Sequence, residues 1–217
     1  MARPIVEPSA IVHPTAILCD DVRIGHGAII EANARIGVGT SVWHYALVRA
    51  GARVGRKCSI GRSAEIGPNV VVGDETRVGS GAQVHHGCDA YPTIIGDRVF
   101  IAPKAFLSND KYPTLVAEFV PQGVIIEDDA VIAADASVVG GLRVCEGAVL
   151  GMGAVLTKVL PRGEIWYGNP ATPRGRRVVH YPGCGEEHWG TLCEDEVCAR
   201  CRELGVEQWR PELGVLE

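Results

Sequence analysis

Aliphatic residues recur at every sixth position along most of this chain. Eleven consecutive positions spaced by six, from Ile24 to Val84, are isoleucine or valine. Four places after each stands a small or β-branched residue; this second set is Ala28, Ala34, Thr40, Ala46, Ala52, Cys58, Ala64, Val70, Thr76, Ala82 and Cys88. A period of six fits neither an α-helix nor simple strand alternation. It predicts short strands and corners that wind into a solenoid, with both sets pointing inward.

The same register resumes further along the chain and ends near residue 175. It covers two later groups of aliphatic residues: Ile95, Ile101, Leu107, and Ile126, Ile132, Val138, Val144, Leu150, Leu156. At the N-terminus we place Ile11 and Ile17 in the repeat, with one extra residue before Ile24. Glycine commonly follows the aliphatic residue, where it can relieve the backbone at a bend. The pattern therefore predicts an all-β domain over residues 1–175, with parallel ladders between coils.

Two insertions interrupt the repeat. Five extra residues, in a segment that includes Tyr91 and Pro92, separate the hexad of Val84 from the hexad that begins at Ile95. A longer segment, about residues 108–124, precedes Ile126. Insertions in a solenoid lie at corners and often on the binding face. We expect the longer one to be a loop that covers an acceptor site; the alternative is a neutral surface excursion.

Composition and charge exclude several classes of protein. Of the 217 residues, 47% are hydrophobic but only 6% are aromatic, which predicts a core of thin aliphatic layers. The formal net charge is -5, and no basic stripe suggests a nucleic-acid partner. No apolar run approaches the roughly 20 residues that span a bilayer. The first ten residues lack a signal-peptide pattern, so we expect a cytoplasmic protein with no membrane partner.

Residues 176–217 abandon the repeat and form a cysteine-rich extension. The four cysteines concerned are Cys184, Cys193, Cys198 and Cys201. The last two have the spacing of half a zinc site, whereas the first two are irregularly spaced. Four thiolates could close a structural zinc site that stabilises a segment with no other core. The alternative is four unpaired thiols on a helical extension.

The repeat and its motifs resemble the hexapeptide-repeat acyltransferases over roughly residues 5–175. The shared features include the closing runs 151–158 (GMGAVLTK) and 168–171 (GNPA). Residues 42–45 (VWHY) and 106–113 (FLSNDKYP) are similar to segments of acetyltransferases that act on nucleotide-linked 3-amino sugars. Thr114 stands where arginine is usual, and Ser108 replaces threonine. These two differences leave the identity of the sugar open. The resemblance implies a left-handed parallel β-helix, a homotrimer with sites between subunits, and acetyl-CoA as co-substrate.

The hexad register also sorts the histidines. Acyl transfer from a thioester requires a nucleophile, a group that takes its proton, and donors for the developing oxyanion. Counting hexads places His86 and Asn109 one coil apart on one face, at the base of the longer insertion. We predict His86 as the general base, with His85 as the reserve. The alternative is that both histidines merely lie on an exposed sheet face. A second pair, His26 and His44, should stack one coil apart on another face.

Substrate and cofactor contacts follow from the resemblance. It implies that Trp43 and His44 contact the nucleotide, and that Asp110 and Tyr112 bind the substrate from the longer insertion. The pantetheine arm is expected along small residues of the C-terminal coils, with cations near the phosphates; the expected residues are Ala133, Gly151, Ala154, Lys158, Arg162 and Arg174. The alternative for Trp43 and His44 is an exposed aromatic and imidazole, and the alternative for the cations is solvated charge.

The function predicted from the sequence is an acetyl-CoA-dependent N-acetyltransferase acting on a nucleotide-linked amino sugar. An O-acetyltransferase acting on a sugar or another small hydroxyl acceptor, and a non-catalytic scaffold, are the alternatives. A γ-class carbonic anhydrase shares the solenoid but needs three suitably spaced histidines. After His86 the next histidine is His180, so the required ligands are missing.

Overall fold

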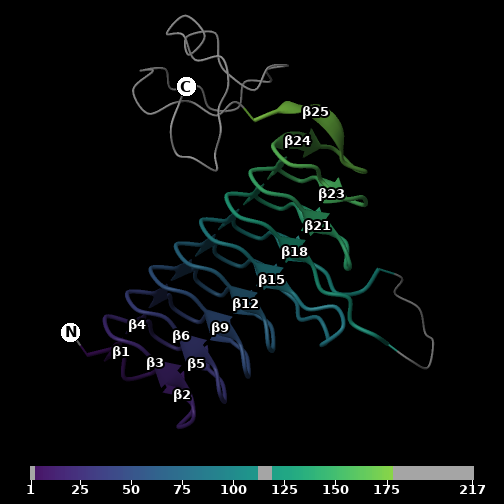
Figure 1. Cartoon of the computed structure of the whole chain (residues 1–217). Coiled ribbons are helices and arrows are strands. Elements are labelled where there is room, and N and C mark those ends of the chain that lie inside the picture. Colours follow the sequence, from purple (N-terminus) through teal and green to yellow (C-terminus); the bar gives the residue numbers. More distant parts are fainter. Residues whose placement is uncertain (1–2, 112–118, 178–217) are drawn as a thin grey trace, which may run out of the picture.

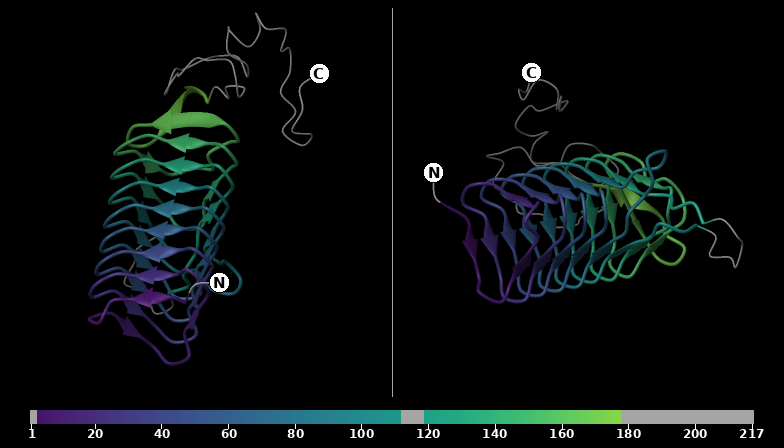
Figure 2. Two further views of the ribbon diagram at one scale, coloured as in Figure 1. Left: turned by 90° about the vertical axis from the view of Figure 1, so that its left-hand side faces the viewer. Right: turned by 90° about the horizontal axis from the view of Figure 1, so that it is seen from below.

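The chain winds into a parallel β-solenoid. The computed structural model describes residues 3–111 and 119–177, and within these ranges every regular element is a strand. Successive coils stack along one axis, with the N-terminus at one end and β25 at the other (Figure 1, Figure 2). No helix within the described ranges is long and apolar enough to cross a membrane.

Three sheets form the walls of the solenoid. Sheet A has ten strands, in spatial order β1 (Ile5–Val6), β4 (Arg23–Ile24), β7 (Ser41–Val42), β10 (Ser59–Ile60), β13 (Arg77–Val78), β16 (Phe100–Ile101), β19 (Val131–Ile132), β22 (Val149–Leu150), β24 (Glu164–Tyr167) and β25 (Thr172–Arg176). Sheet B has eight: β2 (Ile11–Val12), β5 (Ile29–Ile30), β8 (Leu47–Val48), β11 (Glu65–Ile66), β14 (Gln83–Val84), β17 (Phe106–Leu107), β20 (Ser137–Val138) and β23 (Val155–Leu156). Sheet C has seven: β3 (Ile17–Leu18), β6 (Arg35–Ile36), β9 (Arg53–Val54), β12 (Val71–Val72), β15 (Ile94–Ile95), β18 (Ile125–Ile126) and β21 (Arg143–Val144).

The chain passes from sheet A to sheet B to sheet C and back, so three corners alternate with the sheets; we call them the A–B, B–C and C–A corners. From β1 to β20, each strand pairs in parallel with the strand three places later, as in the pairing of Val6 with Ile24. An antiparallel pair, β24 with β25, ends the described solenoid. The predicted parallel β-helix of hexapeptide repeats is confirmed.

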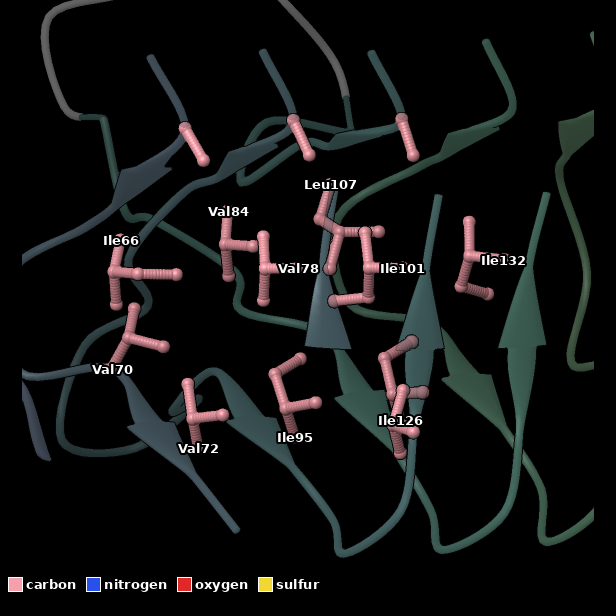
Figure 3. Packing of buried hydrophobic residues seen from close by; sticks show 14 of the residues in the cluster. Ile66, Val70, Val72, Val78, Val84, Ile95, Ile101, Leu107, Ile126 and Ile132 are labelled. Atoms are coloured by element: carbon pink, nitrogen blue, oxygen red, sulfur yellow. The ribbon is translucent and has the colours of Figure 1, made fainter. Parts of the chain in front are cut away.

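The core is a column of aliphatic side chains along the solenoid axis. From Ile24 to Val84, each aliphatic residue of the repeat is at most 4% exposed. Side chains from all three walls, such as Ile101, Leu107 and Ile126, meet in this column (Figure 3). Burying one such side chain contributes about 1.5–3 kcal/mol of transfer free energy. The predicted inward orientation of the aliphatic set is therefore confirmed for these coils.

The prediction for the first coil is wrong by one residue. Ile11 is 63% exposed and Ile17 is 48% exposed, whereas their successors Val12 and Leu18 pack against the core. The period of six therefore continues unbroken through Val12 and Leu18, and no extra residue precedes Ile24. Because β2 and β3 carry an aliphatic residue at both positions, hydrophobicity alone did not separate the inward from the outward face.

Cys88 is a second correction. We expected it to point inward as the small residue of its hexad, but it is only partly buried, and Thr93, 1% exposed, fills that place. The first insertion begins at Cys88, so the inward position moves to the residue that stands two places before Ile95. The cysteines of the predicted zinc site, Cys184, Cys193, Cys198 and Cys201, lie outside the described residues. The boundary near residue 175 and the extension that follows it stay predictions.

Candidate functional site

Both insertions lie at the B–C corner, on adjacent coils. The first joins β14 to β15, and the second joins β17 to β18. Because β14 pairs with β17 and β15 pairs with β18, the insertions leave and rejoin the solenoid beside each other (Figure 1). The B–C corner of these coils is therefore the place where the repeat is most altered.

The first insertion is a tight turn. Cys88 and Tyr91 exchange two backbone hydrogen bonds, each 3.0 Å long, with Asp89 and Ala90 at the tip. The hydroxyl of Thr93 then donates a 2.8 Å hydrogen bond to the carbonyl of His85. The turn is thus bonded to the residue that precedes His86.

The described ends of the second insertion are bonded to their surroundings. The N–H of Gln122 donates to the carbonyl of Asn109 at 2.8 Å, which brings the outgoing and returning ends of the insertion together. The N–H of Gly123 donates to the carbonyl of Tyr91 at 2.9 Å, which joins the two insertions. Ser108 and Asp110 form a local turn through the Ser108 hydroxyl. Tyr112 lies outside the described residues, so its predicted contact with the substrate stays a prediction.

His86 and Asn109 occupy equivalent places on adjacent coils, as predicted. Val84 pairs with Leu107 in the ladder, and the N–H of His85 donates to the carbonyl of Leu107 at 3.1 Å. His86 is partly buried, and Asn109 is 8% exposed. The structure thus places the partly exposed His86 one coil away from the buried Asn109, at the corner where both insertions occur.

His85 differs from His86 in its packing. Its ring meets the ring of Phe106 edge-on, with centroids 4.9 Å apart. The imidazole therefore covers an aromatic side chain on the outer face of sheet B. This contact favours His86 over His85 as the residue that can reach a substrate.

The column of His86 continues through Asn109 to Gly140 and Lys158. These residues each stand two places after an aliphatic residue of sheet B. A side chain at Gly140 would contact the backbone of Asn109 and the carbonyl of Gln122, so glycine allows the close approach. At about 4.8 Å per coil, exposed Lys158 lies about 14 Å from His86 along the axis. Sequence reasoning placed Lys158 near the cofactor but did not align it with His86.

His26 and His44 stack at the A–B corner, which confirms the prediction for this pair. Their ring centroids are 5.5 Å apart with an interplanar angle of 24°. The backbone N–H of His26 donates to His44 Nδ1 at 3.0 Å. The indole N–H of Trp43, a residue that is 50% exposed, donates to the Ser59 hydroxyl at 3.0 Å. Trp43 and His44 follow a strand of sheet A, whereas His86 follows a strand of sheet B. One chain therefore does not bring these two groups to the same corner.

The predicted cofactor residues do not form one cluster in a single chain. Ala133 and Gly151 follow paired strands of sheet A and lie one coil apart. Ala154 is fully buried, so its side chain packs in the core and does not line a surface; this part of the prediction is wrong.

The three cations separate as well. Lys158 is at the B–C corner, whereas Arg162 pairs with Glu146 at 3.0 Å on the C–A corner. The guanidinium of Arg174, on β25, lies 4.8 Å from the centroid of the Tyr167 ring.

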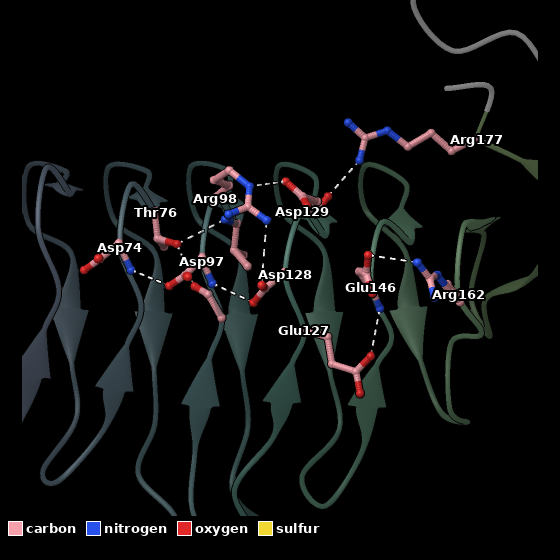
Figure 4. Close-up of polar contacts among 12 residues, drawn as sticks. Asp74, Thr76, Asp97, Arg98, Glu127, Asp128, Asp129, Glu146, Arg162 and Arg177 are labelled. Atoms are coloured by element: carbon pink, nitrogen blue, oxygen red, sulfur yellow. Dashed lines mark hydrogen bonds and ion pairs between the residues drawn. The ribbon is translucent and has the colours of Figure 1, made fainter. Parts of the chain in front are cut away.

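The C–A corner carries a ladder of carboxylates that serves the scaffold. The backbone N–H groups of Arg56, Asp74 and Asp97 donate to the carboxylates of Asp74, Asp97 and Asp128, each on the next coil. Figure 4 shows the bonds from Asp74 to Asp97 and from Asp97 to Asp128. A glycine precedes each of the three donor residues, and a side chain on Gly55, Gly73 or Gly96 would clash with the carboxylate on the next coil. The Arg56 side chain also donates to Asp74, and these hydrogen bonds hold the pKa of that carboxyl below its ordinary value. Within the described ranges no three histidine, cysteine, aspartate or glutamate side chains are grouped to hold a metal ion.

Two features of the candidate site were missed from the sequence. Thr93 was not singled out, although it fills the inward place two residues before Ile95, as Thr40 and Thr76 do before Val42 and Val78. The contact between Tyr91 and Gly123 has no signal in the sequence, because it joins backbone groups of two insertions.

Comparison with known proteins agrees with this architecture. Residues 123–158 match a family model described as a hexapeptide repeat of succinyl-transferase. The chain is 46% identical over 48 residues to 2,3,4,5-tetrahydropyridine-2,6-dicarboxylate N-acetyltransferase of Staphylococcus aureus; the match covers 22% of this chain and 20% of the relative. The curated relative is thus matched over about a fifth of its length.

Solved structures share the fold over a longer range. A UDP-N-acetylglucosamine acyltransferase from Campylobacter jejuni superposes with a TM-score of 0.64 and 19% identity, over 79% of this chain and 74% of the other. LpxA from Acinetobacter baumannii gives a TM-score of 0.52 and 18% identity over the same shares. The described chain is a hexapeptide-repeat β-solenoid. In its repeat and its fold it resembles the hexapeptide-repeat acyltransferases, as the sequence predicted.

Proposed function

We propose that this protein is an acetyl-CoA-dependent N-acetyltransferase whose acceptor is a nucleotide-linked amino sugar. The observation that carries the proposal is the placement of His86 beside Asn109 at the B–C corner, where both insertions meet the solenoid. The local similarity to an N-acetyltransferase supports acetyl transfer to an amine. The motifs of residues 42–45 and 106–113 support an amino-sugar acceptor.

In this proposal His86 takes a proton from the acceptor amine as the carbon–nitrogen bond to the acetyl group forms. It then passes that proton to the sulfur as the carbon–sulfur bond breaks, so that CoA leaves as the thiol. A neutral imidazole can accept that proton near neutral pH. The carboxamide of Asn109 can both donate and accept hydrogen bonds, which suits it to hold the acceptor or the acetyl oxygen. His85 is the reserve base, and Asp110 and Tyr112 are proposed contacts of the sugar.

The cofactor and the nucleotide are proposed to bind between subunits of a homotrimer. Trp43, His44, Ala133 and Gly151 lie at the A–B corner, whereas His86 and Lys158 lie at the B–C corner. These two corners cannot meet within one chain, but the A–B corner of one subunit can face the B–C corner of its neighbour. The CoA phosphates would then be held by Lys158, with Arg162 and Arg174 as further candidates.

O-acetyl transfer is the second candidate, because a hydroxyl acceptor depends more on a base such as His86 than an amine does. The reaction would be the same acyl transfer with an oxygen nucleophile. O-acetyl transfer and N-acetyl transfer are distinguished by whether hydroxyl acceptors or amine acceptors support release of the CoA thiol.

The decisive test measures thiol release from acetyl-CoA with a panel of nucleotide-linked amino sugars, matched sugars with a hydroxyl in place of the amine, and free amines. We expect release with the amino sugars and an acetylated product by mass spectrometry. Acetyl-CoA should also raise the melting temperature, since a ligand of the folded state stabilises it. No release with any acceptor, together with an unchanged melting temperature at millimolar acetyl-CoA, would favour the non-catalytic scaffold.

A further inference from the structure

The first insertion, residues 88–93, contacts both the segment that carries His86 and the returning end of the second insertion. Thr93 is 1% exposed, and its hydroxyl donates to the carbonyl of His85 at 2.8 Å. Two residues earlier, the carbonyl of Tyr91 accepts the N–H of Gly123 at 2.9 Å. This six-residue segment therefore forms hydrogen bonds to two parts of the candidate site that are far apart along the chain.

The bond made by Thr93 differs from those of the other buried threonines. Thr40 donates to the carbonyl of Gly55 and Thr76 donates to that of Gly96, and both acceptors lie on the next coil. Thr93 donates instead to the carbonyl of His85, which is the first residue of the same B–C corner that contains Thr93. Its hydroxyl thus closes the first insertion into a ring and fixes the peptide next to His86.

The contact between the two insertions depends on glycine. A side chain on Gly123 would clash with the carbonyl carbon of Pro92 and the nitrogen of Thr93. The carbonyl of Tyr91 accepts the N–H groups of both Cys88 and Gly123, so one oxygen is shared between the two insertions. On the far side, the N–H of Gly141 donates to the carbonyl of Gln122 at 3.1 Å. The returning end of the second insertion is held between the first insertion and the next coil.

We infer that the first insertion is a positioning element that sets His86 and the returning end of the second insertion in register, with Thr93 as its positioning residue. The inference rests on the proposed function in one respect: it takes His86 as the base. Loss of the Thr93 hydroxyl leaves the His85 carbonyl without this donor in a partly buried place. The peptide of His86 and the turn that contacts Gly123 then lose their common anchor.

The kinetic test compares Thr93→Val with Thr93→Ser and with Thr40→Val. Thr93→Val should lower kcat for the amine acceptor by about tenfold, because small displacements of a catalytic group are costly. The KM for acetyl-CoA should stay within about twofold of wild type, and Thr93→Ser should restore kcat. Thr40→Val removes an equally buried hydroxyl from the C–A corner, so it reports the effect of lost stability alone. Equal losses of kcat in Thr93→Val and Thr40→Val would overturn the inference.

A second readout needs no activity. Amide hydrogen exchange at Gln122 and Gly123 reports how firmly the second insertion is held. Thr93→Val should raise exchange at Gly123 by about tenfold or more, while Thr40→Val leaves it at the wild-type rate. If acetyl transfer is never detected, the proposed function fails but this exchange pattern still decides the inference. Unchanged exchange at Gly123 in Thr93→Val would overturn it even in an active enzyme.

Discussion

His86 and Asn109 are separated by one coil of the solenoid, each standing two residues after an aliphatic side chain of sheet B. If this pair is the catalytic centre, His86→Gln should lower kcat/KM for the acceptor by about 10²–10⁴, the contribution typical of general acid–base catalysis. His85→Gln should cost far less, because the His85 ring is engaged with Phe106. Steady-state kinetics with the acceptor varied would check both. A larger loss for His85→Gln would reverse the two roles.

The separation of Trp43 from His86 predicts a site shared between subunits. Trp43→Ala and His86→Gln should each be nearly inactive as purified homo-oligomers. Mixing their subunits by denaturation and refolding should restore part of the activity, because some interfaces then contain both intact residues. Mixed samples that remain as inactive as the separate variants would argue for a site within one chain. Refolded wild type provides the reference for losses during the procedure.

The carboxylate ladder predicts a loss of stability in acid. Arg56 lowers the pKa of Asp74 in the folded state, so the folded protein binds this proton more weakly than the unfolded chain. The stabilisation is complete above the unfolded pKa, ordinarily near 3.8, and is lost as the pH falls through the lower folded pKa. Asp74→Asn should therefore destabilise the protein at neutral pH and have little effect in strong acid.

Urea denaturation at a series of pH values would measure this difference. Glu75→Gln is the matched control, since Glu75 is an exposed neighbour with only a 3.4 Å pair to Lys57. A pH-independent effect of Asp74→Asn would show that the carboxylate acts through its shape and not its charge.

The close approach of adjacent coils predicts that Gly73 cannot be replaced. An alanine there would clash with the Asp97 carboxylate and the Gly96 backbone, and backbone atoms cannot move aside cheaply. We expect Gly73→Ala to cost about 3 kcal/mol or more. Gly147→Ala should cost only about 1–2 kcal/mol, because Gly147 has open space around it and only a left-handed φ of 65° to oppose a side chain. Thermal and denaturant unfolding would compare the two.

The two residues of β5 provide a test of the core. Ile30 is fully buried, and its neighbour Ile29 is 37% exposed on the outer face. Ile30→Ala should cost about 2–5 kcal/mol of unfolding free energy, whereas Ile29→Ala should cost under about 1 kcal/mol in the monomer. A large loss of stability for Ile29→Ala that grows with protein concentration would instead indicate that sheet B packs against another subunit.

The repeat alone determined the architecture, because an aliphatic residue at every sixth position leaves few ways to bury the side chains other than stacked three-sided coils. It also placed His26 beside His44 and His86 beside Asn109, since a fixed coil length converts sequence spacing into spatial neighbours. Where both residues of a strand are aliphatic, as in β2, hydrophobicity alone did not decide which one faces inward. There the pairing of Val12 with Ile30 decided it.

Only the tertiary structure decided how the insertions join. The bonds from Thr93 to His85 and from Gly123 to Tyr91 depend on the path of irregular backbone, which no periodicity encodes. The structure also separated Lys158 from Arg162, because residues a few places apart in sequence fall on different corners once the chain turns, and it placed Arg174 on β25. Local repetition thus fixes the scaffold, whereas the site arises where that repetition is broken and backbone groups from distant segments must pair with each other.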